Sequence, residues 1–249
     1  MEEKNMEFTN SPLVTYTQLS PNHSGQRTHA IDRITPHCVV GQCSVEVLGD
    51  IFAPESRQAS SNYGIGTDGR VAMYVEEKNR SWCSSSNAND QRAVTIEYAS
   101  DTTEPYAMNE KVFTALVFLC ADICRRNGKS KLLWIPDKAA SLAYEPKEDE
   151  MLLTVHRWFA NKSCPGDWLY NRLGSLAWQV TDLLSPKEKT GVPGDGNTPH
   201  DWAVDAFKWA VENGILRGSS EDKVDYRLND PVTREEMITM LYRLYNPKI

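Results

Sequence analysis

A proline- and glycine-rich stretch near the C-terminus, residues 185–199, limits the folds that are open to this chain. It reads SPKEKTGVPGDGNTP, with three prolines, three glycines and one apolar residue. This composition is typical of a linker, because proline and glycine interrupt regular structure and little apolar surface remains to be buried. We therefore expect two parts, residues 1–184 and residues 200–249, joined by a linker at residues 185–199.

The larger part alternates between strand-like and helix-like patterns. Strand patterns occur at residues 34–40, 62–75, 93–99 and 131–135. The second of these is a predicted hairpin, with Asp68 and Gly69 in its turn. Helical spacing of apolar residues predicts two helices, one from Val112 to Ile123 and a last one from Leu169 to Leu184. The expected fold class is α/β, a mixed β-sheet flanked by helices.

The C-terminal part has a different pattern and predicts a small helical module. PHDWAVDAFKWAVENGIL is one predicted helix, which ends at Gly214, and VTREEMITMLYRLY is another. Thr233 and Glu236 have the spacing of a capping box at the start of the second helix. Two short helices can barely form a core, so this module is expected to rest on the first part, on another copy or on a ligand.

Composition excludes several classes of protein. The 249 residues are 40% apolar and 24% charged, with a net charge of −7. Without a basic run of five residues, nucleic acid is not an expected partner, and without 18 consecutive apolar residues a membrane span is not expected. The N-terminal MEEKNMEFTN is polar and acidic, so we expect synthesis in the cytoplasm without a signal peptide. Six cysteines are too few for a disulfide framework.

The segment from His156 to Trp168, HRWFANKSCPGDW, carries the first sign of a metal site. Cys164 stands before Pro165, and proline is favoured at the first position of a helix. A cysteine next to a helix N-terminus has a lowered pKa, and its thiolate is a good zinc ligand. His156 and Cys164 supply two ligands, so a third must come from elsewhere in the chain.

His37 is the best third candidate, because it lies in an apolar strand where an imidazole without a partner would be costly. The alternative is an ordinary buried histidine together with a helix-capping cysteine. Glu97 alternates with Val94, Ile96 and Tyr98 and so points to the opposite face of its strand. A carboxylate there is either solvated or a proton acceptor.

Lys162 would place a cation where an oxyanion forms during hydrolysis. Taken singly it would be a surface charge, but together with the candidate ligands and Glu97 it is typical of metal-assisted hydrolysis. Cys120 and Cys124 are four residues apart on a predicted helix and either chelate a metal or, more simply, fill the core.

The segments HCVV, ASSNYGIGTDGRV, AVTIEYAS and HRWFANKSCPG occur in this order. Over about residues 8 to 182, the chain resembles zinc-dependent N-acetylmuramoyl-L-alanine amidases of the amidase-2 family, relatives of peptidoglycan recognition proteins and of phage endolysins. The resemblance implies a Zn²⁺ held by His37, His156 and Cys164, with Glu97 as general base and Lys162 stabilising the tetrahedral intermediate. It further implies cleavage of the amide between N-acetylmuramic acid and L-alanine of the stem peptide.

One position departs from the family pattern. Some relatives carry a catalytic tyrosine in the hairpin strand, where this chain has Ser61, with Tyr63 two residues further on. The retained candidate ligands favour catalysis, and the absence of a signal peptide favours a phage or prophage endolysin that lyses Gram-positive cells at the wall. The alternative is a peptidoglycan-binding recognition module without catalysis.

The C-terminal part resembles a single S-layer homology motif, through WAVDAFKWAVENGILRGSS and VTREE. The resemblance implies binding to a secondary cell-wall polymer, with Arg234 at a helix N-terminus as the anion contact. Such motifs usually occur in threes, so the alternatives are a trimer of chains and a structural role. The chain is expected to be a monomer or a homo-oligomer formed through this module.

Overall fold

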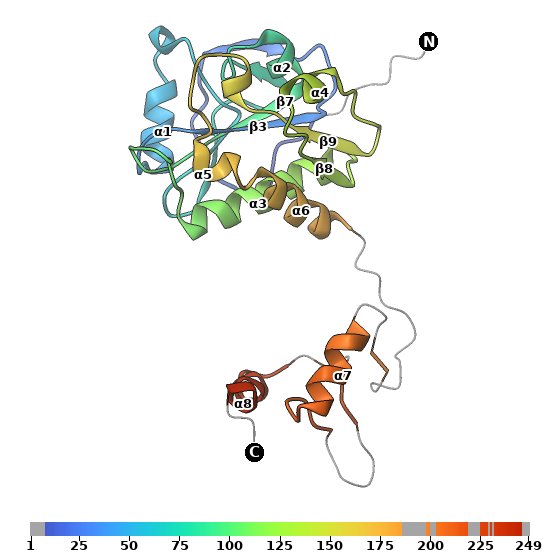
Figure 1. Cartoon of the computed structure of the whole chain (residues 1–249). Coiled ribbons are helices and arrows are strands. Elements are labelled where there is room, and N and C mark those ends of the chain that lie inside the picture. Colours follow the sequence, from blue (N-terminus) through green and yellow to red (C-terminus); the bar gives the residue numbers. More distant parts are fainter. Residues whose placement is uncertain are drawn as a thin grey trace. The chain divides into compact units, whose positions relative to one another are not determined.

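The computed structural model describes residues 8–185, 198–199, 203–218, 225–228, 230 and 232–245. The chain forms two compact units, Met1–Pro186 and Lys187–Ile249 (Figure 1). Most of the predicted linker at residues 185–199 lies outside the described residues. No helix in the described part of the chain combines the length and the apolar composition needed to cross a lipid bilayer.

The first unit is built on a mixed sheet of seven strands, in the order β1-β5-β4-β7-β3-β9-β8. The strands are β1 (Val14–Thr17), β3 (Arg33–Cys38), β4 (Tyr63–Ile65), β5 (Val71–Met73), β7 (Ala93–Tyr98), β8 (Lys131–Leu133) and β9 (Glu150–Leu153). Only β4 and β5 pair antiparallel, as the two arms of the predicted hairpin. A separate antiparallel pair joins β2 (His23–Gln26) and β6 (Asn79–Ser81). The expected α/β fold with a mixed sheet is confirmed.

Helices cover both faces of this sheet. They are α1 (Val45–Phe52), α2 (Asn87–Arg92), α3 (Glu110–Arg126), α4 (Lys138–Ala143), α5 (Asp167–Tyr170) and α6 (Leu173–Leu184), with short 3-10 helices at Glu55–Arg57 and His156–Trp158. Helices α3 and α6 run side by side beneath the sheet in Figure 1. The successive residues Val71 and Ala72 of β5 enter different core clusters, one against α3 and one against α1. The strand therefore has a helix on each side.

The predicted helix from Leu169 to Leu184 is two helices, which is a correction to the sequence analysis. Residues 171–172 form a turn between α5 and α6. Leu169, Leu173 and Leu176 are all fully buried on the two sides of this turn. Because the apolar spacing continues across the interruption, periodicity alone could not reveal it.

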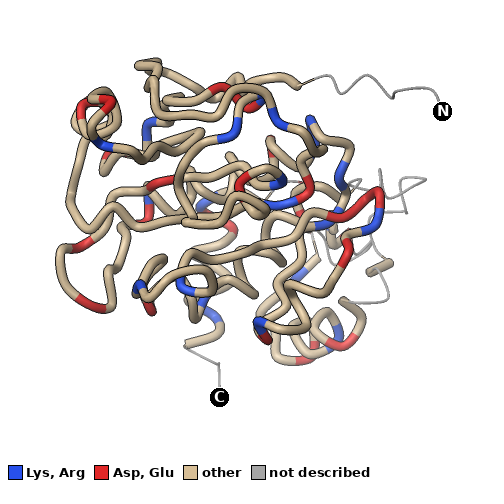
Figure 2. The backbone as a smooth tube through the Cα atoms, turned by 90° about the horizontal axis from the view of Figure 1, so that it is seen from above, with Lys and Arg blue, Asp and Glu red and all other residues tan. Residues whose placement is uncertain are grey.

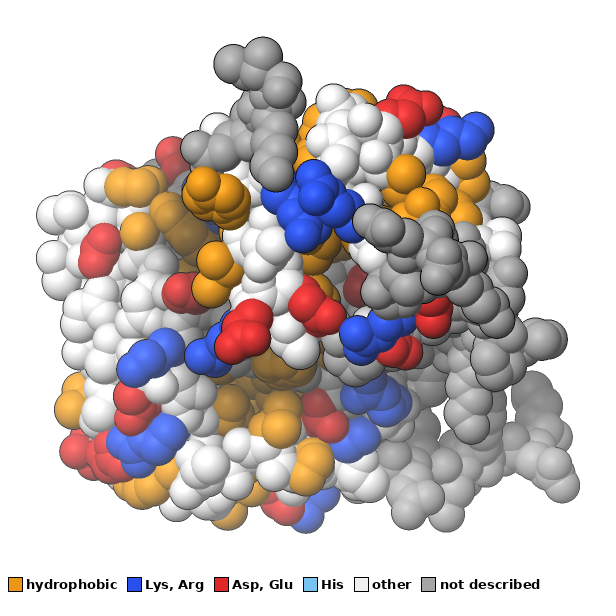
Figure 3. Space-filling view, turned by 90° about the horizontal axis from the view of Figure 1, so that it is seen from below, with side chains coloured by type: hydrophobic (Ala, Val, Ile, Leu, Met, Phe, Trp, Pro, Cys, Tyr) orange, Lys and Arg blue, Asp and Glu red, His pale blue; other side chains and the backbone are white. Residues whose placement is uncertain are grey.

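The two central strands, β3 and β7, have one apolar face and one polar face. In β7, Val94, Ile96 and Tyr98 belong to the core cluster against α3. Thr95 and Glu97 alternate with them and so point to the opposite face. Basic and acidic residues are interspersed along the backbone (Figure 2), and on the face shown in Figure 3 hydrophobic side chains lie in separate groups among charged ones.

The second unit contains α7 (Val204–Glu212) and α8 (Arg234–Tyr245). The predicted capping box is confirmed: Thr233 N donates to Glu236 Oε2 at 2.7 Å, and Glu236 N donates to Thr233 Oγ1 at 3.1 Å. Gly214 follows α7 with φ of +66°, a conformation that suits glycine at a helix end. Neither helix contributes a buried residue among those described, in line with a module that has little core of its own.

Candidate metal and hydrolytic site

Two neighbouring parallel strands bring His37 and Glu97 together. In the register of β3 and β7, His37 stands opposite Glu97. Both residues lie near the carboxyl ends of their strands, which is where α/β sheets carry binding sites. Thr35 and Thr95 precede them on the same polar face, and Thr35 Oγ1 lies 2.7 Å from Thr154 Oγ1. This fixed polar layer supports the floor of the site.

The segment after β9 adds the other two candidate ligands. His156 begins the 3-10 helix His156–Trp158, and its ring centroid lies 5.0 Å from that of His37. Cys164 Sγ lies 3.3 Å from His37 Nδ1. Donor atoms of His37, His156 and Cys164 all lie within 4.8 Å of one another. The structure thus brings together three predicted side chains that are far apart in the sequence.

The chemistry of the two imidazoles suits a metal. Burial lowers the pKa of His37 well below its usual value, with His156 adding to the effect. Burial also lowers the pKa of His156, and nearby Lys162 contributes. Both rings are therefore neutral at pH 7, the form that binds zinc. His37 Nε2 is buried and has no hydrogen-bond partner among the described residues.

The local structure around Cys164 differs from the prediction. Helix α5 begins at Asp167 and has only four residues, with Gly166 as its N-cap, so Cys164 is not at the helix start. Burial raises the pKa of the Cys164 thiol well above its usual value, and Cys38 and Glu97 add to the rise. The predicted lowering of the Cys164 pKa by a helix N-terminus is wrong. A nearby cation would instead be needed to favour the thiolate.

The Glu97 side chain lines a cavity of about 580 Å³ on the polar side of the sheet. A cavity of this volume is large enough for a ligand. His156 and Lys162 line the same cavity, as do Arg57, Trp82 and Cys83. Burial raises the pKa of Glu97 to about 7, while Cys83 and Arg57 oppose the shift. A carboxyl group with this pKa can exchange a proton near neutral pH.

The two tryptophans near the site have different roles. Trp82 lines the cavity and donates from Nε1 to Ser24 Oγ at 2.6 Å. Trp158 is buried and stacks on Trp134, with ring centroids 5.2 Å apart.

Two further cavity residues, Cys83 and Arg57, were not predicted from the sequence. Neither lies in an apolar pattern or a motif that would indicate a role in the site.

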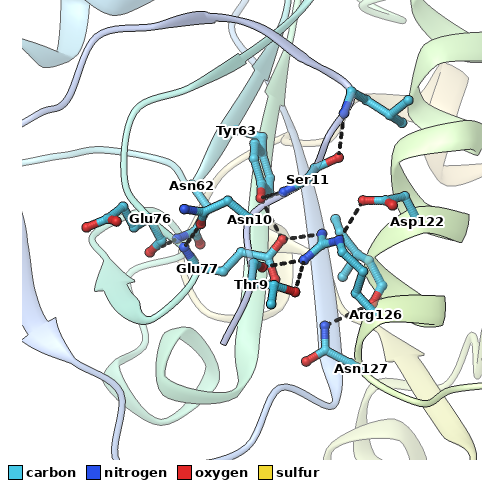
Figure 4. A network of polar contacts seen from close by, with 12 residues as sticks. Thr9, Asn10, Ser11, Asn62, Tyr63, Glu76, Glu77, Asp122, Arg126 and Asn127 are labelled. Atoms are coloured by element: carbon cyan, nitrogen blue, oxygen red, sulfur yellow. Dashed lines mark hydrogen bonds and ion pairs between the residues drawn. The ribbon is translucent and has the colours of Figure 1, made fainter. Parts of the chain in front are cut away.

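Tyr63 belongs to a network of polar contacts (Figure 4) and does not line the cavity. Its hydroxyl donates to Glu77 Oε1 at 2.6 Å and accepts from Ser11 N at 2.8 Å. Tyr63 pairs with Ile96 across the sheet and joins the core cluster on the α3 side. Ser61 is fully buried and donates to Tyr63 O. Neither residue lines the cavity that holds Glu97.

The remaining predicted residues lie elsewhere. Cys120 and Cys124 are fully buried in the core cluster, which fits their reading as small core residues. Arg234 is exposed at the first residue of α8 in the second unit. A cavity in that unit is lined by three other arginines, Arg217, Arg227 and Arg243.

The Tyr98 hydroxyl holds the segment that carries Cys164, donating to Pro165 O at 2.5 Å. We expect Tyr98→Phe to lower the free energy of unfolding by about 1–3 kcal/mol, because a buried carbonyl loses its donor, and to weaken any binding of zinc by the candidate ligands. Urea unfolding and zinc competition measure the two effects. Tyr74→Phe is the matched control, since the Tyr74 hydroxyl donates to Val45 O in the other cluster. Equal zinc affinity in both variants would contradict a positioning role for Tyr98.

Comparison with known proteins gives one family. The family model described as N-acetylmuramoyl-L-alanine amidase matches residues 23–167, more than half of the chain. No curated protein sequence matches.

Solved structures that match include a mutant endolysin from Bacillus subtilis, with 12% identity over 66% of this chain and 97% of that one and a TM-score of 0.48. A selenomethionine AmpD derivative matches with 13% identity over 72% and 98% and a TM-score of 0.48. Drosophila peptidoglycan recognition protein SA matches with 18% identity over 63% and 89% and a TM-score of 0.44.

Proposed function

The chain belongs to the N-acetylmuramoyl-L-alanine amidase family, and we propose that it is a zinc-dependent hydrolase of peptidoglycan. The bond cut is the amide between N-acetylmuramic acid and L-alanine of the stem peptide. The observation that carries the proposal is the convergence of His37, His156 and Cys164 beside Glu97, at one end of a ligand-sized cavity. Two neutral imidazoles and one thiol match the donor set of a catalytic zinc site, which keeps a position open.

Each residue has a distinct task in this proposal. His37, His156 and Cys164 hold the ion, which when bound supplies a Lewis acid that polarises the amide carbonyl and lowers the pKa of water. Glu97 accepts a proton from the attacking water and passes it to the leaving nitrogen; burial raises its pKa and the bound cation would lower it, which keeps the carboxylate available as a base. Lys162 is exposed in the cavity and stabilises the developing oxyanion.

The competing proposal is a recognition module that binds peptidoglycan without cutting it. The structure favours the hydrolase, because a binding module has no need for a buried carboxyl group of raised pKa beside a ligand set. Digestion of purified Gram-positive peptidoglycan, with and without a zinc chelator, separates the two. New L-alanine amino termini without new reducing ends, lost with chelator, support the amidase. Binding without any product supports the recognition module.

Cys164→Ser is expected to remove both activity and high-affinity zinc binding while leaving the fold intact. Loss of a hydrogen-bond partner of a metal ligand already lowers affinity about 10- to 100-fold, so loss of the ligand itself should exceed that range. Zinc content after dialysis and amide cleavage are the measurements. Cys43→Ser is the control, since Cys43 belongs to neither donor set found among the described residues. Unchanged zinc affinity in Cys164→Ser would remove Cys164 from the ligand set.

We further propose a lytic role against Gram-positive cells, as for phage and prophage endolysins, with the second unit binding a secondary wall polymer in the manner of an S-layer homology motif. Support comes from the sequence motifs and from the exposed position of Arg234 at the N-terminus of α8. Sedimentation of full-length protein with cell walls tests this. Arg234→Glu should reduce the bound fraction if the unit binds polymer, whereas unchanged sedimentation would favour a structural role.

A further inference from the structure

Cys83 lines the cavity but has no role in the proposed reaction. Its thiol donates to Glu97 Oε1, with Sγ and Oε1 3.8 Å apart. The turn that carries Cys83 is fixed, because its backbone N donates to Asp90 Oδ2 at 3.2 Å and Ser84 N donates to the same oxygen at 3.1 Å. The thiol is therefore held beside Glu97 by its backbone as well as by its own contact.

Cys83 completes a second group of potential ligands. Donor atoms of His37, Cys83 and Glu97 lie within 4.8 Å of one another. Zinc bond lengths in a tetrahedral site put a sulfur and an oxygen ligand about 3.6 Å apart, close to the 3.8 Å between Cys83 Sγ and Glu97 Oε1. One nitrogen, one sulfur and one oxygen donor suit a borderline or soft divalent cation rather than magnesium or calcium.

Two atoms of this group lack protein partners. His37 Nε2 and Glu97 Oε2 are buried and have no hydrogen bond among the described residues. Buried polar atoms are nearly always satisfied, so two orphans in one group point to a ligand. The positions also differ in access, since Cys83 and Glu97 both line the open cavity, whereas of His156 and Cys164 only His156 lines it. The cavity therefore exposes both partners of His37 in the group with Cys83 but only one of them in the group with Cys164.

We propose that His37, Cys83 and Glu97 form a second, alternative binding position for a divalent cation of the zinc class, which serves as the entry position to the site. His37 is common to both groups, so ligand exchange from Cys83 and Glu97 to His156 and Cys164 moves the ion inward while His37 retains it. Cys83 releases its thiol proton to solvent on binding; on exchange Cys164 releases its thiol proton and Cys83 takes one up, so the exchange step is proton-neutral. The inference rests on the proposed function only in taking the group with Cys164 as the final position.

The test uses Cd²⁺ and the full-length chain, because each cadmium-bound thiolate adds ultraviolet charge-transfer absorbance. In Cys164→Ser, the final position is disabled, and we expect one equivalent of Cd²⁺ with the absorbance of one thiolate. The double variant Cys164→Ser/Cys83→Ser should lose that absorbance. Cys164→Ser/Cys43→Ser is the matched control and should keep it. His156→Ala offers a second route to the same measurement, since His156 is half-buried and its removal spares the core.

Kinetics supply the second readout. Uptake of Zn²⁺ from a chromophoric chelator should be slower in Cys83→Ser than in the unaltered chain, with the same final zinc content. Absorbance that persists without Cys83, or folded Cys164→Ser and His156→Ala proteins that take up no Cd²⁺, would overturn the entry position. These outcomes are independent of whether the zinc-loaded chain cuts peptidoglycan, so failure of the proposed function is recognised separately.

Discussion

Glu97→Gln is expected to lower amide cleavage by about 10²- to 10⁴-fold, the usual contribution of a general base, while zinc stays bound. Glutamine has nearly the same shape but cannot accept a proton near neutral pH. Glu97 Oε2 has no hydrogen bond among the described residues, so the substitution breaks no protein contact at that atom. The pairing of β3 with β7, which places His37, is unaffected by the side chain.

Cleavage of purified peptidoglycan, zinc content and thermal unfolding would be measured on the same preparation. Glu55→Gln is the control, because Glu55 is an exposed carboxylate on the short helix that also carries Arg57 at the cavity. A Glu97→Gln protein with full activity would remove Glu97 from the mechanism. A protein that loses zinc along with activity would show that Glu97 acts on the ion rather than on the proton.

Much of the first unit could be predicted because its central elements have strong periodicity. Residues 93–99 alternate strictly, which predicts the direction of Glu97 against Val94, Ile96 and Tyr98. Helix α3 carries an apolar stripe over its 17 residues and ends before Gly128, whose φ is +68°. Strand β9 has only four residues and was not predicted, because a short apolar run fits a helix as well as a strand.

The site was harder to predict, because it depends on contacts between distant parts of the chain. The register that sets His37 opposite Glu97 joins strands about sixty residues apart. The proposed ligand set came from motif resemblance, since spacing alone left the ordinary buried histidine open. Cys83 lies beside Glu97 because of the turn after β6. The position of such a turn cannot be predicted from the periodicity of apolar residues. Tyr63 shares a strand face with Ser61 in sequence, but only the fold shows that its hydroxyl meets Glu77.

Arg126→Met is expected to lower the free energy of unfolding by about 3–5 kcal/mol, because it leaves a buried carboxylate without its cation. Glu77 is 1% exposed, and Arg126 Nη2 donates to its Oε1 at 2.5 Å. Arg126 Nε also donates to Asp122 at 2.8 Å, and its other nitrogen contacts Thr9 O. The network ties α3 to the N-terminal segment, as Figure 4 shows.

Urea unfolding separates the loss of the charge pair from the loss of packing. Arg125→Met is the matched control on the same helix, since Arg125 is exposed and should cost less than about 1 kcal/mol. Glu77→Gln removes the buried negative charge, so Arg126→Met/Glu77→Gln should be less destabilised than Arg126→Met alone. If the double variant is instead the less stable of the two, the carboxylate is stabilised by Tyr63 rather than by Arg126. The strict test is therefore whether Glu77→Gln restores part of the stability lost in Arg126→Met, which is expected only where the loss comes from an unpaired buried charge.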